Sequence, residues 1–155
     1  EILLSSLAMN GVPIGPALAT LLGLMPVLSI LSVQRTRLTD GFLSKIPASC
    51  LSLNVAGSNI SEEQLVRFAQ NCRECQFLNV ADCWDLTDAT LQPVLEQYLR
   101  NISILHLTNC SLISDASVSH ISTDKLELLH CQHTAVSKDL LQRLKKKIPF
   151  LNCTV

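Results

Sequence analysis

The sequence predicts an α/β solenoid in which parallel strands line the concave face and helices cover the convex face. Three observations predict it. A short apolar motif recurs along the chain, and successive copies lie about 22 to 27 residues apart. A compact Thr, Ser or Cys follows most copies by five residues. A helix-start signal such as Ser61-Glu62 or Ser114-Asp115 comes next. Units of one strand and one helix stack into a right-handed βα superhelix.

The predicted strands are centred on one apolar residue per repeat, which we call the anchor. Apolar side chains also stand three residues before and two residues after nearly every anchor. Side chains two apart point to the same side of a strand, so each strand is predicted to be half buried. The anchors are Leu7, Leu31, Leu53, Leu78, Leu105, Leu129 and Leu151.

The predicted helices follow the strands. A hydroxyl at the N-cap satisfies a free backbone N–H, and an acid beside it suits the helix dipole. Ser61 with Gln64 is a capping box. Helical spacing of apolar residues then appears in residues 65–72, 91–98 and 140–148. Pro93 falls in the first turns of its helix, where a missing N–H costs least.

Length and composition predict a single domain, because 155 residues can bury one core. We expect about six repeats and the start of a seventh over residues 1–155. Residues 1–27 are expected to be a degenerate first repeat, in a chain whose two ends look cut from a longer protein. Residues 2–33 carry no charged side chain, but their prolines and glycines argue against a membrane helix. No membrane association is expected.

The seven cysteines predict a reducing compartment, such as the cytoplasm. An odd count argues against a disulfide framework, and a buried free cysteine behaves as a small hydrophobe. Secretion stays open as an alternative, because glycosylation sequons begin at Asn59, Asn101, Asn109 and Asn152. The core columns are predicted to hold Cys50, Cys75, Cys83, Cys110, Cys131 and Cys153, with Cys72 closing a helix face.

The spacing within residues 72–88 and 102–115 resembles the cysteine-containing leucine-rich repeat. Residues 50–62, 126–138 and, more loosely, 28–40 follow it with substitutions. This subtype is best known from F-box proteins, where it forms the substrate-recognition half of SCF-type ubiquitin ligases. The resemblance implies a leucine-rich repeat solenoid that recognises a protein partner, and a ubiquitin ligase adaptor where an F-box flanks it.

No enzymatic activity, cofactor or metal is expected. The sequence has no Gly-rich phosphate loop, no G-x-S-x-G and no pair of inward carboxylates. The residue types of a zinc site occur in Cys72, Cys75, His130, Cys131 and His133. The register, however, places Cys75 and Cys131 two repeats apart with another strand between them, which is a poor geometry for zinc. The net charge is −1 and Lys145–Lys147 is the one dense basic run, so nucleic acid is not expected as a partner.

The candidate site is on the concave face, where residues one before, one after and three after each anchor point outward. Phe77, Ile104 and Leu128 are adjacent in the predicted stack, and we call them the apolar stripe. A contiguous exposed apolar patch indicates a binding surface. The predicted partner-binding residues are Phe77, Asn79, Ile104, His106, Leu128, His130, Gln132 and Trp84.

The function expected from these residues is recognition of a protein partner, by a monomer or as part of a larger complex. Two alternatives stay open. One is a non-ubiquitin scaffold, an assembly factor or a bacterial effector repeat domain. The other is a fragment of a glycosylated extracellular receptor. The two neighbouring imidazoles predict binding that weakens below about pH 6.5.

Overall fold

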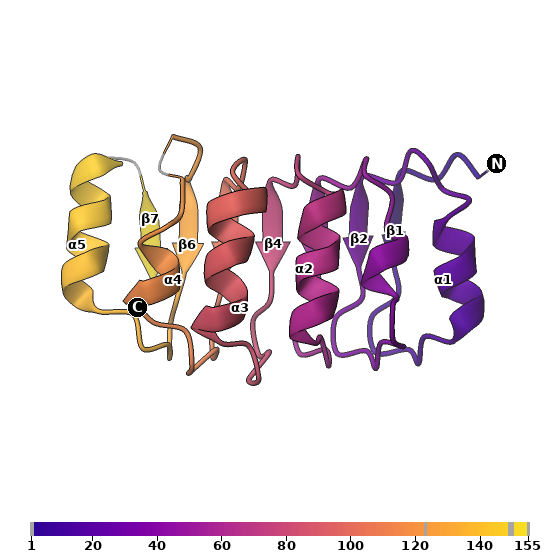
Figure 1. Ribbon diagram of the computed structural model, residues 1–155, viewed down its shortest axis with the longest axis horizontal. Helices are drawn as coiled ribbons and strands as arrows, with labels where there is room; N and C mark the ends of the chain where they lie inside the picture. Colours follow the sequence, from indigo (N-terminus) through magenta and orange to yellow (C-terminus); the bar gives the residue numbers. More distant parts are fainter. Residues whose placement is uncertain (1, 123, 149–150, 155) are drawn as a thin grey trace.

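The fold was analysed in a computed structural model that describes residues 2–122, 124–148 and 151–154. It is an α/β fold built on one parallel sheet of seven strands, which follow one another in chain order across the sheet (Figure 1). Each strand has three residues. They are β1 Ser6–Ala8, β2 Ile30–Ser32, β3 Ser52–Asn54, β4 Phe77–Asn79, β5 Ile104–His106, β6 Leu128–His130 and β7 Asn152–Thr154.

The helices lie together on one face of the sheet (Figure 1). A 3₁₀ turn, not an α-helix, follows the expected start at Thr39-Asp40, and a π-helical turn directly follows the α-helix that ends at Pro93. No helix among the described residues combines the length and apolarity needed to cross a membrane. The elements are α1 Pro16–Leu22, η1 Leu43–Lys45, α2 Glu62–Asn71, α3 Asp88–Pro93, η2 Val94–Tyr98, α4 Asp115–Val118 and α5 Lys138–Lys147.

The predicted register is confirmed for the first six strands. Leu31 pairs with Leu53, Leu78 with Leu105, and the series runs on from Leu7 to Leu129. The seventh anchor was wrong by two residues, because Cys153 and not Leu151 pairs with Leu129. A slip of two residues leaves every side chain on the same face, so the apolar pattern alone could not distinguish the two registers.

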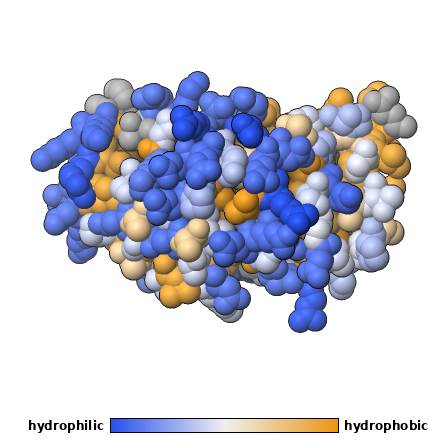
Figure 2. All heavy atoms as spheres, in the orientation of Figure 1, coloured by the Kyte–Doolittle hydropathy of each residue, from blue (hydrophilic) through white to orange (hydrophobic). Residues whose placement is uncertain are grey.

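The core lies between the sheet and the helices and is made of aliphatic and thiol side chains. Strands β3 to β6 share one pattern, with a fully buried anchor between two partly exposed neighbours. The core is less covered at β1, where Leu7 and Met9 are only partly buried. Figure 2 shows hydrophilic side chains over most of the helix face and apolar ones toward α1, where Leu21 and Leu24 are exposed.

A column of hydrogen bonds explains the small residue five positions after four of the anchors, whereas Thr134, at the same position in its repeat, donates to the Cys131 carbonyl of its own layer. In the other four repeats, the hydroxyl or thiol donates to a backbone carbonyl of the preceding layer, two residues after that layer's anchor. Thr, Ser and Cys are therefore interchangeable here, because each is compact and carries one donor. The bonds run from Thr36 to Met9 at 3.2 Å, from Ser58 to Val33 at 2.8 Å, from Cys83 to Val55 at 3.6 Å and from Cys110 to Val80 at 3.1 Å.

The helix starts are confirmed at three of the predicted serines. Ser61 and Gln64 form the capping box, and Ser114 and Ser137 accept backbone N–H groups of their own helices. Thr87 occupies the N-cap position of α3 without a side-chain capping bond.

The acid that follows two of these caps also binds the next layer. The Asp88 carboxylate accepts hydrogen bonds from the Ser114 backbone N–H at 3.0 Å and from the Ser114 hydroxyl at 2.5 Å. The Ser117 hydroxyl donates to it as well. Asp115 accepts the same pair of bonds from Ser137, at 2.7 and 2.6 Å. The Ser/Thr-Asp motif therefore joins layers, which the expected dipole role did not anticipate.

Replacing Asp88 should weaken the junction between these layers. Burial alone would raise the pKa of Asp88, but the hydrogen bonds from Ser114 and Ser117 outweigh burial and lower it below 3.8. The stabilisation is therefore present above pH 3.8 and lost as the pH falls through the lowered pKa. We expect Asp88→Ala to reduce the free energy of unfolding by about 2 kcal/mol at pH 7. Urea unfolding checks this, with the exposed Asp85→Ala as the control, expected within about 0.5 kcal/mol of the parent.

Candidate functional site: the strand face and the rim pocket

The apolar stripe lies on the face of the sheet that points away from the helices, which we call the strand face. Phe77 pairs with Ile104, and Ile104 pairs with Leu128, so the three side chains form one row across β4, β5 and β6. Phe77, Ile104 and Leu128 are each partly exposed, whereas the anchor that directly follows each of them is fully buried. The parallel register therefore brings together three residues that lie about 25 residues apart in the sequence.

The two histidines stack beside the stripe. The ring centroids of His106 and His130 lie 4.4 Å apart with an angle of 30° between the planes, and Phe77 lies 5.5 Å from His106. Burial lowers the pKa of His106, and repulsion by His130 lowers it further. His106 is thus neutral at pH 7, and its ring extends the apolar stripe. Among the other predicted residues, Asn79 accepts the Ala81 N–H at 3.0 Å, and the Gln132 carbonyl accepts the Asn109 N–H at 2.9 Å.

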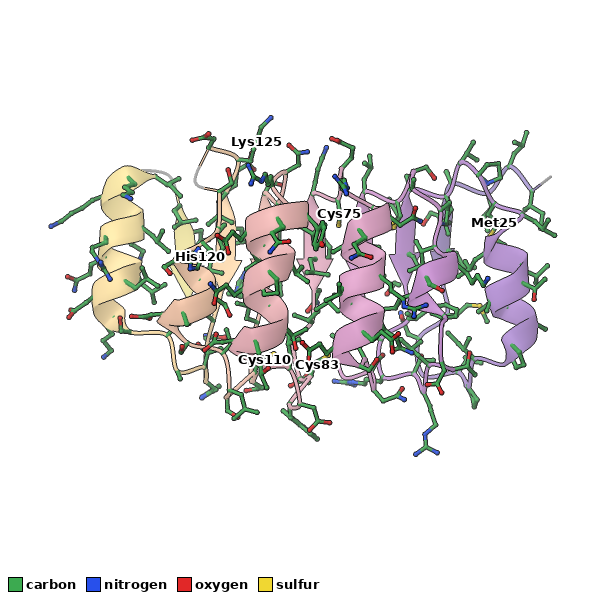
Figure 3. The ribbon with its side chains drawn as sticks, viewed as in Figure 1. Met25, Cys75, Cys83, Cys110, His120 and Lys125 are labelled. Carbon is green, nitrogen blue, oxygen red and sulfur yellow. The ribbon has the colours of Figure 1, made fainter. Side chains whose placement is uncertain are left out.

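Trp84 belongs to a different surface. It lies in the turn after β4, at the edge where the strands end, and 68% of it is exposed. Figure 3 marks this edge by Cys83 and Cys110, while Cys75 lies toward the opposite edge. The prediction grouped Trp84 with the stripe because it stands in the loop that follows the Phe77 strand. The chain leaves the sheet between the two, so their side chains line separate surfaces.

The turns at this edge share a left-handed residue, which the sequence analysis missed. It stands four residues after the anchor in all of the first six repeats, with φ between 51° and 69°. Glycine and asparagine adopt this conformation readily, and their recurrence at one position is the signal that could have revealed it. The residues are Gly11, Arg35, Gly57, Asp82, Asn109 and His133.

Three of these turns line an open surface pocket of about 540 Å³, which we call the rim pocket. Its walls come from the turns after β2, β3 and β4, so the stack of layers builds it. No residue of the apolar stripe lines it. The lining residues are Arg35, Gly57, Ser58, Asn59, Asp82, Trp84 and Asp85.

The six described thiols are buried, and those of Cys50, Cys72, Cys75, Cys83 and Cys110 donate hydrogen bonds to backbone carbonyls. The predicted burial is confirmed for six cysteines, while the Cys153 side chain lies outside the described residues. Burial raises the pKa of Cys50 and Cys110 to about 11 and of Cys75 and Cys83 to about 12. It raises that of Cys72 too. A redox thiol in a Cys-x-x-Cys motif needs the opposite shift. No group of three or more metal-ligating side chains gathers in the described part of the chain.

These raised pKa values predict that the buried thiols resist alkylation while the protein is folded. With iodoacetamide at pH 8, we expect no label on Cys50, Cys72, Cys75, Cys83 or Cys110, because the thiolate is the reacting species. The same five should react fully in guanidinium chloride. Peptide mass spectrometry measures both. Rapid labelling of one of them in the folded protein would contradict the packing described here.

Comparisons with known proteins do not assign a family. No protein-family model matches the chain, and no curated protein matches it either. The fold therefore defines the class of the molecule, an α/β protein with an all-parallel sheet in chain order, and its surfaces must supply the functional argument.

Proposed function

We propose that this chain is a leucine-rich repeat module that binds a protein partner through its strand face. The observation that carries the proposal is the apolar stripe, three partly exposed aliphatic and aromatic side chains in register on adjacent strands. The five pairings among the first six anchors and the recurring turn support the leucine-rich repeat assignment. A solenoid of this kind offers an extended concave surface for partner binding.

The surroundings of the apolar stripe favour a protein partner over a small molecule. An apolar centre with a neutral polar margin is the usual composition of a protein interface. The uncharged amides of Asn79 and Gln132 supply that margin together with the imidazoles of His106 and His130. Enzymatic activity is not part of the proposal, because the stripe has no nucleophile, general base or charged group aligned for a reaction.

Photo-cross-linking tests which face binds. A benzoylphenylalanine at position 77 replaces one aromatic side chain with another, and the control places it at Arg143, an exposed position on α5. In an extract of the source cells, we expect position 77 to cross-link to one or a few proteins that position 143 does not reach. Equal cross-linking from both positions, or from position 143 alone, would move the interface to the helices and overturn the proposal.

Binding at the stripe should depend on pH through His106. Its pKa is lowered by burial and by His130, and a covering partner would lower it further. Binding then requires the neutral imidazole, so the affinity for the cross-linked partner should stay constant from pH 8 to pH 7. It should weaken as the pH falls below 6.5, where protonation becomes favourable. Affinity measured from pH 8 to pH 5.5 checks this. His106→Asn should flatten the profile, and an unchanged profile in that variant would contradict the role of His106.

The biological setting depends on what accompanies this module. In an F-box protein, the captured partner would be a substrate for ubiquitination, and its ubiquitination in a reconstituted ligase would test that setting. A scaffold, an assembly factor or a bacterial effector would hold the partner without modifying it. An extracellular receptor fragment would carry glycans on its sequons, so glycan mass on the natural protein decides that alternative.

A further inference from the structure

The rim pocket holds charged and aromatic groups that the fold does not use. Arg35 and Asp85 form no ion pair or side-chain hydrogen bond within the described part of the chain. Trp84 is the only tryptophan of the sequence, and among the described residues it is the most exposed large apolar side chain after Leu3. With 68% of Trp84 exposed, most of the indole is available to a ligand, and tryptophan is enriched at the centres of binding sites.

The other polar groups of the pocket are already satisfied. The Ser58 hydroxyl donates to the Val33 carbonyl at 2.8 Å, and the Asn59 side chain accepts the Leu38 N–H at 2.7 Å. The Asp82 Oδ1 atom accepts a hydrogen bond from the Asn109 Nδ2 atom at 2.6 Å, which orients this carboxylate and leaves its second oxygen with lone pairs to offer. A ligand would therefore meet the indole of Trp84, the carboxylates of Asp82 and Asp85, and the guanidinium of Arg35.

The position of these groups is set by the backbone. Gly57 and Asp82 adopt left-handed φ angles of 65° and 58°, and each donates its N–H to the next layer at 2.8 and 2.9 Å. Arg35 holds the same conformation at φ 51°, which a non-glycine residue adopts at some cost. A Cβ at Gly57 would lie 3.2 Å from the Arg35 Cγ atom, so the arginine stem packs closely over the glycine. The backbone that frames the pocket is therefore fixed before any ligand binds.

We infer that the rim pocket binds a cationic side chain, an arginine or lysine of a peptide, against the face of Trp84. A cation over an indole is attracted by the ring quadrupole, and two carboxylates on either side of Trp84 in the sequence add opposite charge. The charges that line the pocket are two negative and one positive, so the local field favours a cation. An acidic peptide or a nucleic-acid phosphate would meet both carboxylates and be repelled.

This site goes beyond the proposed interface on the strand face. The pocket and the stripe share no lining residue, so either can bind while the other is empty. A partner that occupies both would place a basic side chain beside the end of the strands while its apolar segment covers the stripe.

Fluorescence of the single tryptophan tests the inference directly. The probe is a capped hexapeptide of glycine, serine and one arginine, and its matched control replaces the arginine by citrulline, which has the same shape and no charge. We expect a saturable change in Trp84 emission with the arginine peptide, and an affinity at least about fivefold weaker with citrulline. A lysine peptide should also bind. Raising the salt concentration from 50 to 500 mM should weaken the binding.

Substitutions then show which side chains of the rim pocket bind the peptide. Asp85→Asn should weaken arginine-peptide binding about threefold, and Asp139→Asn, an exposed acid in the first turn of α5, should leave it unchanged. Trp84→Ala should abolish arginine-peptide binding. Because this variant has no tryptophan fluorescence, its binding is measured by the NMR shift of the Gly57 amide. Because Trp84 and Asp85 are exposed, circular dichroism should show that both variants fold.

Several results would overturn the inference. They are equal affinity for the arginine and citrulline peptides, stronger binding of a matched glutamate peptide, binding of single-stranded DNA alone, or no binding of the arginine peptide at 10 mM. A variant with the apolar stripe replaced should still bind the arginine peptide. That result separates a failure of this inference from a failure of the proposed function, which the cross-linking experiment decides.

Discussion

Replacing Leu78 by alanine should reduce the free energy of unfolding by about 3 to 4 kcal/mol. Leu78 is the anchor of β4, its side chain is fully buried, and anchors of the same type flank it on β3 and β5. Removing three carbon atoms there leaves a cavity that the neighbouring layers cannot close, because each is held by strand pairing on both sides. Urea unfolding followed by circular dichroism measures the change.

Leu7 provides the matched control for this prediction. It occupies the same column at the first strand, but it is only partly buried, and β1 pairs on one side only. We expect Leu7→Ala to cost about 1 kcal/mol, because less surface is exposed and the edge layer can relax. Equal losses from the two substitutions would mean that β1 is covered as completely as the central strands, which would contradict the burial described here.

Two aspartates in the apolar stripe should remove partner binding. Phe77→Asp with Ile104→Asp places carboxylates where the proposed partner buries apolar surface. We expect the affinity for the cross-linked partner to fall at least about 100-fold, since truncating the centre of an interface costs 2 kcal/mol or more and a buried charge adds to that. Isothermal calorimetry or surface plasmon resonance measures the loss.

The control for this double variant lies in the same row of the strand face. Ile30 pairs with Ser52 in the register that joins Phe77 to Ile104, but both lie outside the stripe. Ile30→Asp with Ser52→Asp introduces the same two charges on adjacent strands, so it accounts for repulsion across the sheet. Binding should survive in the control and fail in the stripe variant. If both fold and both bind, the stripe is not the interface.

Sequence analysis predicted the strands and their register because the apolar columns are simple to read. Leu53, Leu78 and Leu105 each follow a small or apolar residue by three positions, and a strand with one buried face has a strongly specified pairing. The capping box at Ser61 was predictable for a similar reason, since its two side chains lie within one turn of each other. The seventh anchor was predicted at the wrong residue because a shift of two residues preserves the alternation of buried and exposed positions.

The candidate site was predicted in part. The alternation of side chains along β4, β5 and β6 placed Phe77, Ile104 and Leu128 on one face of the sheet, and the strand register then brought them into one row. Trp84 was assigned to the wrong surface, because nothing local in the sequence says where a turn carries its side chain once the chain has left the sheet. The rim pocket depends on three turns from three different layers, so no single segment of sequence contains it.

The sequence by itself determined which side chains are buried, which face the helices cover and how the layers stack, because each of these follows from a repeating pattern of apolar residues. Only the tertiary structure decided what the layers do to one another. It placed the Asp88 carboxylate against Ser114 of the next layer and brought Trp84 into the same pocket as Arg35, from a layer two strands away. Such contacts join residues that are distant in the chain, and their geometry depends on the turn conformations and on the spacing between layers, which periodicity does not encode.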